Sequence, residues 1–211
     1  PRTGNFANDQ RRDIDSIRLQ NHTRIALGTA TTLDVGAFLN TKELFHPIFE
    51  VIDQKSADYG TFARLEHAAG PFALTLGGEI RRGSTRARQY RNVAGQRGAL
   101  TFDADQDART ANLYGEVRVQ PAERLTLIAG AIYADGWRKR QVSYSVGQTQ
   151  DGRIAFDEFS PKFGVLFDAT PDVQLYANYS RSAEFPGFGE VFQSVTVNGV
   201  TTSTFIDAIR P

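Results

Sequence analysis

Arginine is concentrated in one short stretch of the sequence. Residues 81–91 read RRGSTRARQYR, so five arginines and one tyrosine fall within eleven residues. A guanidinium group binds carboxylate or phosphate oxygens through two parallel hydrogen bonds, which makes such a stretch suited to an anionic ligand. We therefore predict an anion-binding site in a loop, with Arg86, Arg88, Tyr90 and Arg91 as the candidate ligand-binding residues.

A second interpretation of the same stretch is a solvated loop that binds nothing. In that case its arginines are paired by Asp103, Asp105 and Asp107 on the returning segment. A nucleic-acid surface is disfavoured, because the 24 basic and 24 acidic residues give the chain zero net charge. A shorter basic stretch, WRKR at 137–140, is typical of an interfacial tryptophan followed by a basic rim.

Residues that could carry out catalysis or bind a metal are few and scattered. The three histidines, His22, His46 and His67, have no partner at ligand spacing, and cysteine is absent. No nucleophile elbow, phosphate-binding loop or dinucleotide-binding turn occurs. The sequence predicts no enzyme activity, no metal site and no cofactor.

The elements that must position these residues are strands, because apolar and polar residues alternate over most of the chain. Period-two alternation of this kind indicates β-strands, and no segment has a 3.6-residue stripe. We predict eight strands, within about 17–27, 33–42, 61–66, 72–81, 111–120, 125–134, 159–168 and 173–180.

The connections between these strands differ in length in a regular order. Tight breaks fall at 28–32, 69–71, 121–124 and 169–172, and long polar links fall at 44–57, 83–107, 138–154 and from 183 onward. Successive connections of an antiparallel meander lie at opposite ends of the sheet, so every tight turn should lie at one end. That arrangement is typical of an outer-membrane barrel.

The composition of the apolar face favours contact with lipid. Its residues are often small, and two of the strands reach the roughly 9–11 residues that cross a bilayer when tilted. Tyr59, Tyr133, Trp137 and Tyr179 lie near strand ends, where we predict membrane-interface aromatics; plain packing is the alternative for each. Further on, Asn198-Gly199 between alternating β-formers predicts a hairpin within the last external link.

Four motifs near the end of the chain resemble TonB-dependent outer-membrane receptors. They are FSPKFG at 159–164, LYANYS at 175–180, EFPGFGE at 184–190 and IRP at 209–211. The resemblance in motifs covers residues 155–192, and the rest of the chain matches by its strand pattern. It implies a 22-stranded barrel with an N-terminal plug that imports ferric siderophores or other scarce nutrients across the Gram-negative outer membrane with energy passed on by TonB.

This chain would then be all-β, an antiparallel up-and-down transmembrane barrel segment of about eight strands. We expect residues 1–211 to be a partial barrel domain, without the plug domain, the TonB-contacting segment or the C-terminal strands. The absence of methionine at position 1 supports an internal piece of a longer chain. The resemblance also implies lipid and lipopolysaccharide as partners, and the arginine stretch would contact an anionic ferric siderophore or lipopolysaccharide phosphates.

Three alternatives remain open at the level of sequence: an outer-membrane enzyme such as a lipase or protease, a small closed barrel, and a soluble β-barrel binding protein. A soluble barrel shows the same alternation with its apolar face turned inward. The sequence does not identify the substrate, because receptors for iron chelates, cobalamin and carbohydrates share the strand pattern.

Overall fold

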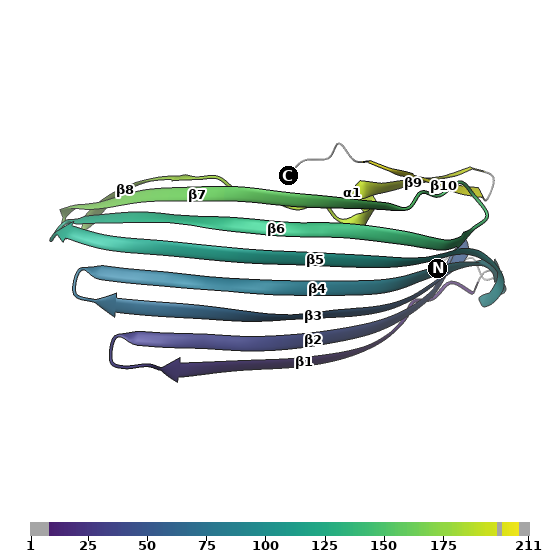
Figure 1. Ribbon diagram of the computed structural model, residues 1–211, viewed down its shortest axis with the longest axis horizontal. Coiled ribbons are helices and arrows are strands. Elements are labelled where there is room, and N and C mark those ends of the chain that lie inside the picture. Colours follow the sequence, from purple (N-terminus) through teal and green to yellow (C-terminus); the bar gives the residue numbers. More distant parts are fainter. Residues whose placement is uncertain (1–8, 198–199, 207–211) are drawn as a thin grey trace.

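The protein is one long antiparallel sheet with a short appended segment (Figure 1). The computed structural model describes residues 9–197 and 200–206. The strands run in chain order as neighbours: β1 (Asp13–Ala26), β2 (Thr31–Pro47), β3 (Glu50–Ala69), β4 (Phe72–Val93), β5 (Gln96–Ala122), β6 (Leu125–Ser145), β7 (Gly152–Thr170) and β8 (Val173–Ser180). The predicted eight-stranded meander is thereby confirmed.

The strands are longer than the sequence pattern predicts. The tight turns lie where expected, but the polar segments 44–57 and 83–107 are not loops: they continue the strands, and turns of only two residues join them at 48–49 and 94–95. In the second of these turns Ala94 and Gly95 both have positive φ, as a two-residue hairpin requires. The predicted long link 138–154 shortens to residues 146–151, because β6 and β7 continue into it from both sides.

Cross-strand charge pairs explain why these polar segments form strands. Lys55 Nζ lies 2.8 Å from Glu43 Oε1 across β2 and β3, and Arg97 Nε lies 2.8 Å from Asp53 Oδ2. Opposite charges facing each other stabilise an antiparallel pair as apolar residues do. The hydrophobic alternation disappears from the sequence, but the backbone ladder continues.

The two faces of the sheet have different compositions. One row across the strands joins Leu33, Leu65, Leu76, Gly115 and Ala131, and the next row joins Thr32, Glu66, Thr75, Glu116 and, beyond Gly130, Lys162. We call the first the apolar face and the second the polar face. Large side chains of the apolar face are open to the surroundings, with Leu113 66 % exposed and Phe163 56 % exposed. A soluble barrel would bury these residues inside.

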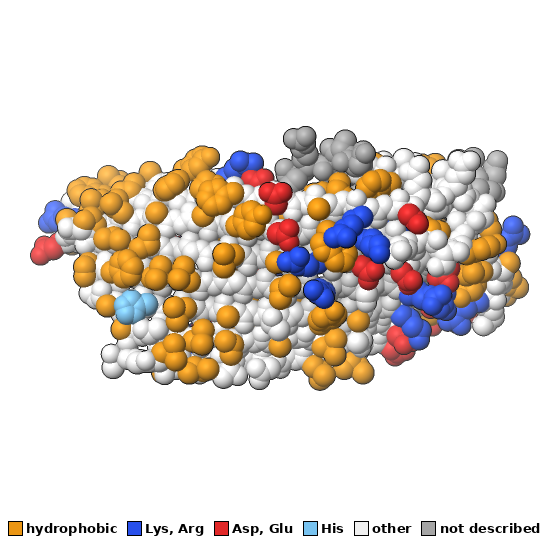
Figure 2. All heavy atoms as spheres, viewed as in Figure 1, with side chains coloured by type: hydrophobic (Ala, Val, Ile, Leu, Met, Phe, Trp, Pro, Cys, Tyr) orange, Lys and Arg blue, Asp and Glu red, His pale blue; other side chains and the backbone are white. Residues whose placement is uncertain are grey.

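The apolar face itself changes character along the strands. Figure 2 shows hydrophobic side chains over the half that holds the tight turns and clustered charges over much of the other half. The change falls at a row that joins Leu39, Tyr59, Arg82, Arg109, Trp137 and Ala155 across β2 to β7. We call this the boundary row. A lipid-facing surface is expected to end in such a change of polarity.

The C-terminal segment packs on the polar face. It contains helix α1 (Phe188–Val191), β9 (Phe192–Val197) and β10 (Val200–Phe205), and β9 pairs with β10 as the predicted hairpin. The turn residues Asn198 and Gly199 lie outside the described residues, as does the IRP motif at 209–211. A small core of Ile154, Phe156, Val191 and Phe192 joins the segment to β7. Within the described chain, no helix has the length and hydropathy to cross a membrane.

Candidate functional site

The arginine stretch lies within strand β4, not in a loop as predicted. Alternation along the strand sends Arg86, Arg88 and Tyr90 to the apolar face, beyond the boundary row, and Arg91 to the polar face. The four candidate ligand-binding residues therefore do not converge. A single ligand cannot bind all four side chains without crossing the sheet.

Arg86 is already paired across the sheet. Its Nε and Nη2 donate to Asp103 Oδ1 and Oδ2 at 3.1 and 2.8 Å, and Arg88 Nε lies 3.6 Å from the same carboxylate. The hydrogen bonds from Arg86 hold the pKa of Asp103 below its usual range. The predicted pairing of the stretch by the returning strand is thus observed for Asp103, which reduces the charge available to a ligand.

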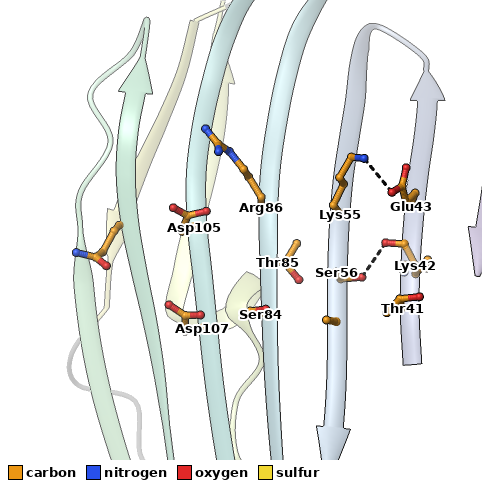
Figure 3. Close-up of a pocket in the computed structure, with 12 residues that line it drawn as sticks. Thr41, Lys42, Glu43, Lys55, Ser56, Ser84, Thr85, Arg86, Asp105 and Asp107 are labelled. Carbon is orange, nitrogen blue, oxygen red and sulfur yellow. Dashed lines mark hydrogen bonds and ion pairs between the residues drawn. The ribbon is translucent and has the colours of Figure 1, made fainter. Parts of the chain in front are cut away.

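A groove of about 500 Å³ lies beside Arg86 and extends from β2 to β6 (Figure 3). Its floor is lined by hydroxyl groups such as those of Ser84 and Thr41, while Lys55 and Glu43 pair at one side. Asp105 and Asp107 enter from β5. Because these side chains belong mostly to the apolar face, the groove opens on the outside of the sheet rather than toward its polar face.

The tight-turn half of the polar face carries charge pairs without a large hollow. Lys162 pairs with Glu116 across Gly130, where a Cβ would lie 3.2 Å from Lys162 Cε. Glycine therefore makes room for the lysine to reach the glutamate two strands away. Together with Arg64 and Tyr114 these groups line a pocket of about 270 Å³. Such a surface is suited to water or a polar protein segment.

The other half of the polar face holds a pocket that the C-terminal segment helps to enclose. A pocket of about 390 Å³ lies between the sheet and the C-terminal segment, lined by Glu50, three glutamines (Gln54, Gln89 and Gln106), Arg140, Phe188, Phe192 and Ser203 among others. Arg140 is 4 % exposed, its Nη2 donates to Gln150 O at 2.7 Å, and its guanidinium lies 4.0 Å from the centroid of the Phe192 ring. Burial lowers the pKa of Arg140.

Arg138 reaches a neighbouring pocket of about 400 Å³ on the same face, together with Asp58, Arg81 and Phe188. Its Nη1 donates to Arg109 O at 3.2 Å and Trp137 O at 3.0 Å, and burial lowers its pKa. The WRKR stretch predicts that Arg138 and Arg140 form one basic rim with Trp137. Period-two counting from Trp137 separates them, since both arginines lie on the polar face and Trp137 on the apolar face.

The four candidate interface aromatics share the apolar face. Tyr133 faces Phe159 across β6 and β7, and Tyr179 faces Phe163 across β7 and β8. Tyr59 and Trp137 both belong to the boundary row. Tyr133 and Tyr179 lie closer to the tight turns than the boundary row does. A membrane-interface role for the four rings stays a prediction.

Comparisons with known proteins agree with this geometry. The sequence model of a family described as TonB dependent receptor-like, beta-barrel, matches residues 2–209. No curated protein sequence matches the chain.

Among solved structures, a copper transporter, OprC, is 19 % identical with a TM-score of 0.64 over 84 % of this chain and 31 % of its own. The unliganded ferric citrate transporter FecA is 14 % identical, with a TM-score of 0.62 over 79 % and 26 %. The open form of the ferric-catecholate import receptor Fiu from E. coli K12 is 12 % identical, with a TM-score of 0.58 over 80 % and 35 %. The chain spans about a quarter to a third of the length of these three proteins.

Proposed function

Because the chain belongs to the TonB-dependent receptor family, in the part that forms the β-barrel, we propose that it is the wall of an outer-membrane importer for a ferric siderophore or a similar scarce nutrient. The chain is located in the Gram-negative outer membrane. The observation that supports import best is the enclosed polar-face pocket under the C-terminal segment. In a barrel this face lines the lumen, where a ligand passes.

The proposed mechanism needs three steps and no chemical reaction. The nutrient is captured at the outer end of the barrel, the plug moves under the action of the TonB complex, and the nutrient passes along the polar face. Residues 1–211 supply part of the wall, and we propose that the plug, the segment that contacts TonB and the remaining strands belong to the rest of the receptor. The lipid and lipopolysaccharide of the outer membrane surround the apolar face.

Energised uptake is tested in cells that carry the complete reading frame. Iron-starved cells should accumulate a radiolabelled ferric siderophore, and deletion of tonB or collapse of the proton gradient should abolish accumulation but leave surface binding intact. Uptake that is independent of both would overturn energised import. Binding of no ferric chelate, with binding of another nutrient instead, would change the substrate class only.

The candidate ligand residues are tested in the same receptor. Replacing Arg86, Arg88 and Arg91 together by Ala should weaken binding of an anionic chelate if they capture it. The structure allows the triple variant to be divided, since Arg91→Ala changes the polar face and the Arg86→Ala/Arg88→Ala pair changes the outside. Unchanged affinity in the triple variant would remove this assignment.

A further inference from the structure

Three glutamines form a diagonal line across the enclosed pocket of the polar face, with one charged residue at each end. Gln106 of β5 is the register partner of Arg140 of β6. Gln54 of β3 lies two residues farther from the tight turns, and Gln89 of β4 lies two residues beyond that. Glu50, at the start of β3, lies another two residues out. The glutamines, which we call the amide track, therefore separate a basic end from an acidic end.

Polar groups that line the pocket lack partners in the protein. Within the part of the chain that the structure describes, the amide groups of Gln54, Gln89 and Gln106 form no hydrogen bond. Ser203 is 3 % exposed, and its Oγ is buried without a hydrogen-bond partner. Buried polar groups are normally satisfied, and a glutamine amide has both donors and an acceptor. These groups fit a ligand that also carries donors and acceptors in alternation.

The two charged ends of the track also have capacity for a ligand, since neither forms an ion pair within the described residues. Arg140 Nε and Nη2 both donate to Gln150 O, at 3.3 and 2.7 Å, which leaves Nη1 for a ligand. The nearby Asp151 carboxylate accepts a backbone hydrogen bond at 2.7 Å instead. Glu50 is the register partner of Arg91, but Arg91 does not line the pocket. Burial raises the pKa of Glu50.

The separation of the charged ends requires an elongated ligand. Arg140 and Glu50 lie three strands and six residues apart in the register, which is about 14 Å across the strands and about 20 Å along them. Their two long side chains reduce the resulting span of about 24 Å to roughly 14 Å. An extended peptide covers about 3.4 Å per residue, so about four residues reach from one end to the other.

We propose that the enclosed pocket binds a short linear peptide, with its carboxylate at Arg140, its amine at Glu50 and its backbone amides on the amide track. This inference rests on the proposed function, in which the polar face lines the route of import, and it names the nutrient. The charged lining residues are one arginine and one glutamate, so the pocket matches the two charged termini of a peptide. A polyanionic chelate would find no excess of positive charge there.

The experiment uses the complete receptor, purified in detergent and kept free of iron. Isothermal titration calorimetry measures the binding of tetraalanine, of its C-terminal amide and of its N-acetyl form. We expect each blocked form to bind at least about tenfold more weakly than free tetraalanine, because each leaves one charged group of the pocket unpaired. Equal binding of the three forms, or no binding of free tetraalanine at millimolar concentration, would overturn the peptide site.

Three variants and one control assign the two ends and the track. Arg140→Gln should bind tetraalanine and its amide equally, and Glu50→Gln should bind tetraalanine and its N-acetyl form equally. Gln106→Leu should weaken tetraalanine several-fold, whereas Gln141→Leu, on the opposite face of β6, should leave binding unchanged. Heat-modifiable migration in gels checks that each variant is folded. Because Arg140 also packs on Phe192, Glu50→Gln decides the assignment if Arg140→Gln loses all binding, and an unchanged terminal preference in folded Glu50→Gln would refute it.

The binding assay and the uptake assay fail independently. Binding in detergent requires neither TonB nor a proton gradient. Peptide binding without TonB-dependent uptake would remove energised import and keep the peptide site. Uptake of a ferric siderophore by a receptor that does not bind tetraalanine would keep import and remove the peptide site.

Discussion

At the scale of single residues, the direction of each side chain decides its role. Arg81 and Arg82 are neighbours in sequence, yet Arg81 lies on the polar face with Glu79 and Arg82 lies at the boundary row. The same separation divides Arg88 from Gln89, which lines the enclosed pocket. The number of arginines therefore identifies a charged segment, and the alternation of side chains along the strand decides on which face of the sheet each arginine lies.

The pairing of Arg86 with Asp103 predicts a pH dependence of stability. Asp103 has a pKa lowered below 3.8 by Arg86, so the pair stabilises the fold above that pH, and this contribution is lost as the pH falls through the lowered value. We expect Arg86→Ala to lower the thermal midpoint of the complete receptor at pH 7 and to have a smaller effect at about pH 2. Thermal unfolding in detergent at both pH values measures this difference.

The pair Lys55 and Glu43 provides the control for that prediction. Both side chains are about three-fifths exposed, at 62 % and 61 %. Exposed pairs contribute little to stability, so Lys55→Ala should change the midpoint less than Arg86→Ala at pH 7. An Arg86→Ala midpoint that differs equally from wild type at both pH values would contradict the role of the Asp103 carboxylate.

At the scale of elements, the C-terminal segment is held to the sheet by aromatic contacts. Phe185 stacks on Phe156 with ring centroids 5.5 Å apart, and Phe192 lies between Phe188 and Phe205 at 6.1 and 5.4 Å. The glycines beneath are matched to these rings: a Cβ on Gly152 would lie 2.6 Å from the Phe205 ring. The segment is therefore fitted to this part of the polar face.

Removing one ring should release the segment without unfolding the barrel. Phe192 is 4 % exposed and also covers Arg140, so Phe192→Ala should cost about 3 kcal/mol of the free energy that holds the segment closed. Hydrogen–deuterium exchange over residues 188–206 should rise strongly, while exchange in β3 to β6 stays as in wild type. Val195→Ala is the matched control, since Val195 is 64 % exposed in the same strand. Equal exchange in both variants would show that the cluster does not hold the segment.

How much of these elements the sequence predicts depends on what fills the strand faces. The parts of the strands with apolar alternation, such as 72–80 and 111–119, are predicted directly from the sequence, because one face of each strand is apolar. Residues 83–93 and 96–107 have polar side chains on both faces, so their ladder depends on cross-strand partners such as Arg86 and Asp103, which are 17 residues apart. No local pattern contains that pairing. The position of the C-terminal segment on β7 is equally non-local.

At the scale of the whole molecule, the sheet has one apolar and one polar face, which we propose to lie against lipid and water. Its stability in a membrane depends on an uninterrupted apolar face from the tight turns to the boundary row. Strands β1 and β8 form its two edges in this chain and are exposed along their length. Unpaired edges of such length invite pairing with other strands, which in the complete barrel would be its own neighbours.

A charge placed on the apolar face should destabilise the complete barrel. Leu76 is 45 % exposed and lies on the apolar face between the tight turns and the boundary row. Leu76→Arg should therefore reduce the free energy of unfolding in lipid vesicles by about 2–4 kcal/mol. Thr75→Arg, the adjacent residue on the polar face beside Glu116, should change it much less. Denaturant titration in vesicles measures both. Equal losses would mean that the apolar face does not contact lipid.

Strands β4 and β5 continue beyond the boundary row, and this continuation determines which surface a molecule approaching that end of the sheet contacts. From Arg109 to the turn at Ala94-Gly95, β5 runs 14 residues, or about 45 Å at the usual rise per residue. Even when tilted, this pair of strands would extend well past the apolar part of the sheet. The backbones of β4 and β5 remain paired nearly to the turn. A large molecule that approaches this end therefore meets strands joined by a two-residue turn. Its recognition would depend on side chains spread over several strands rather than on a long loop.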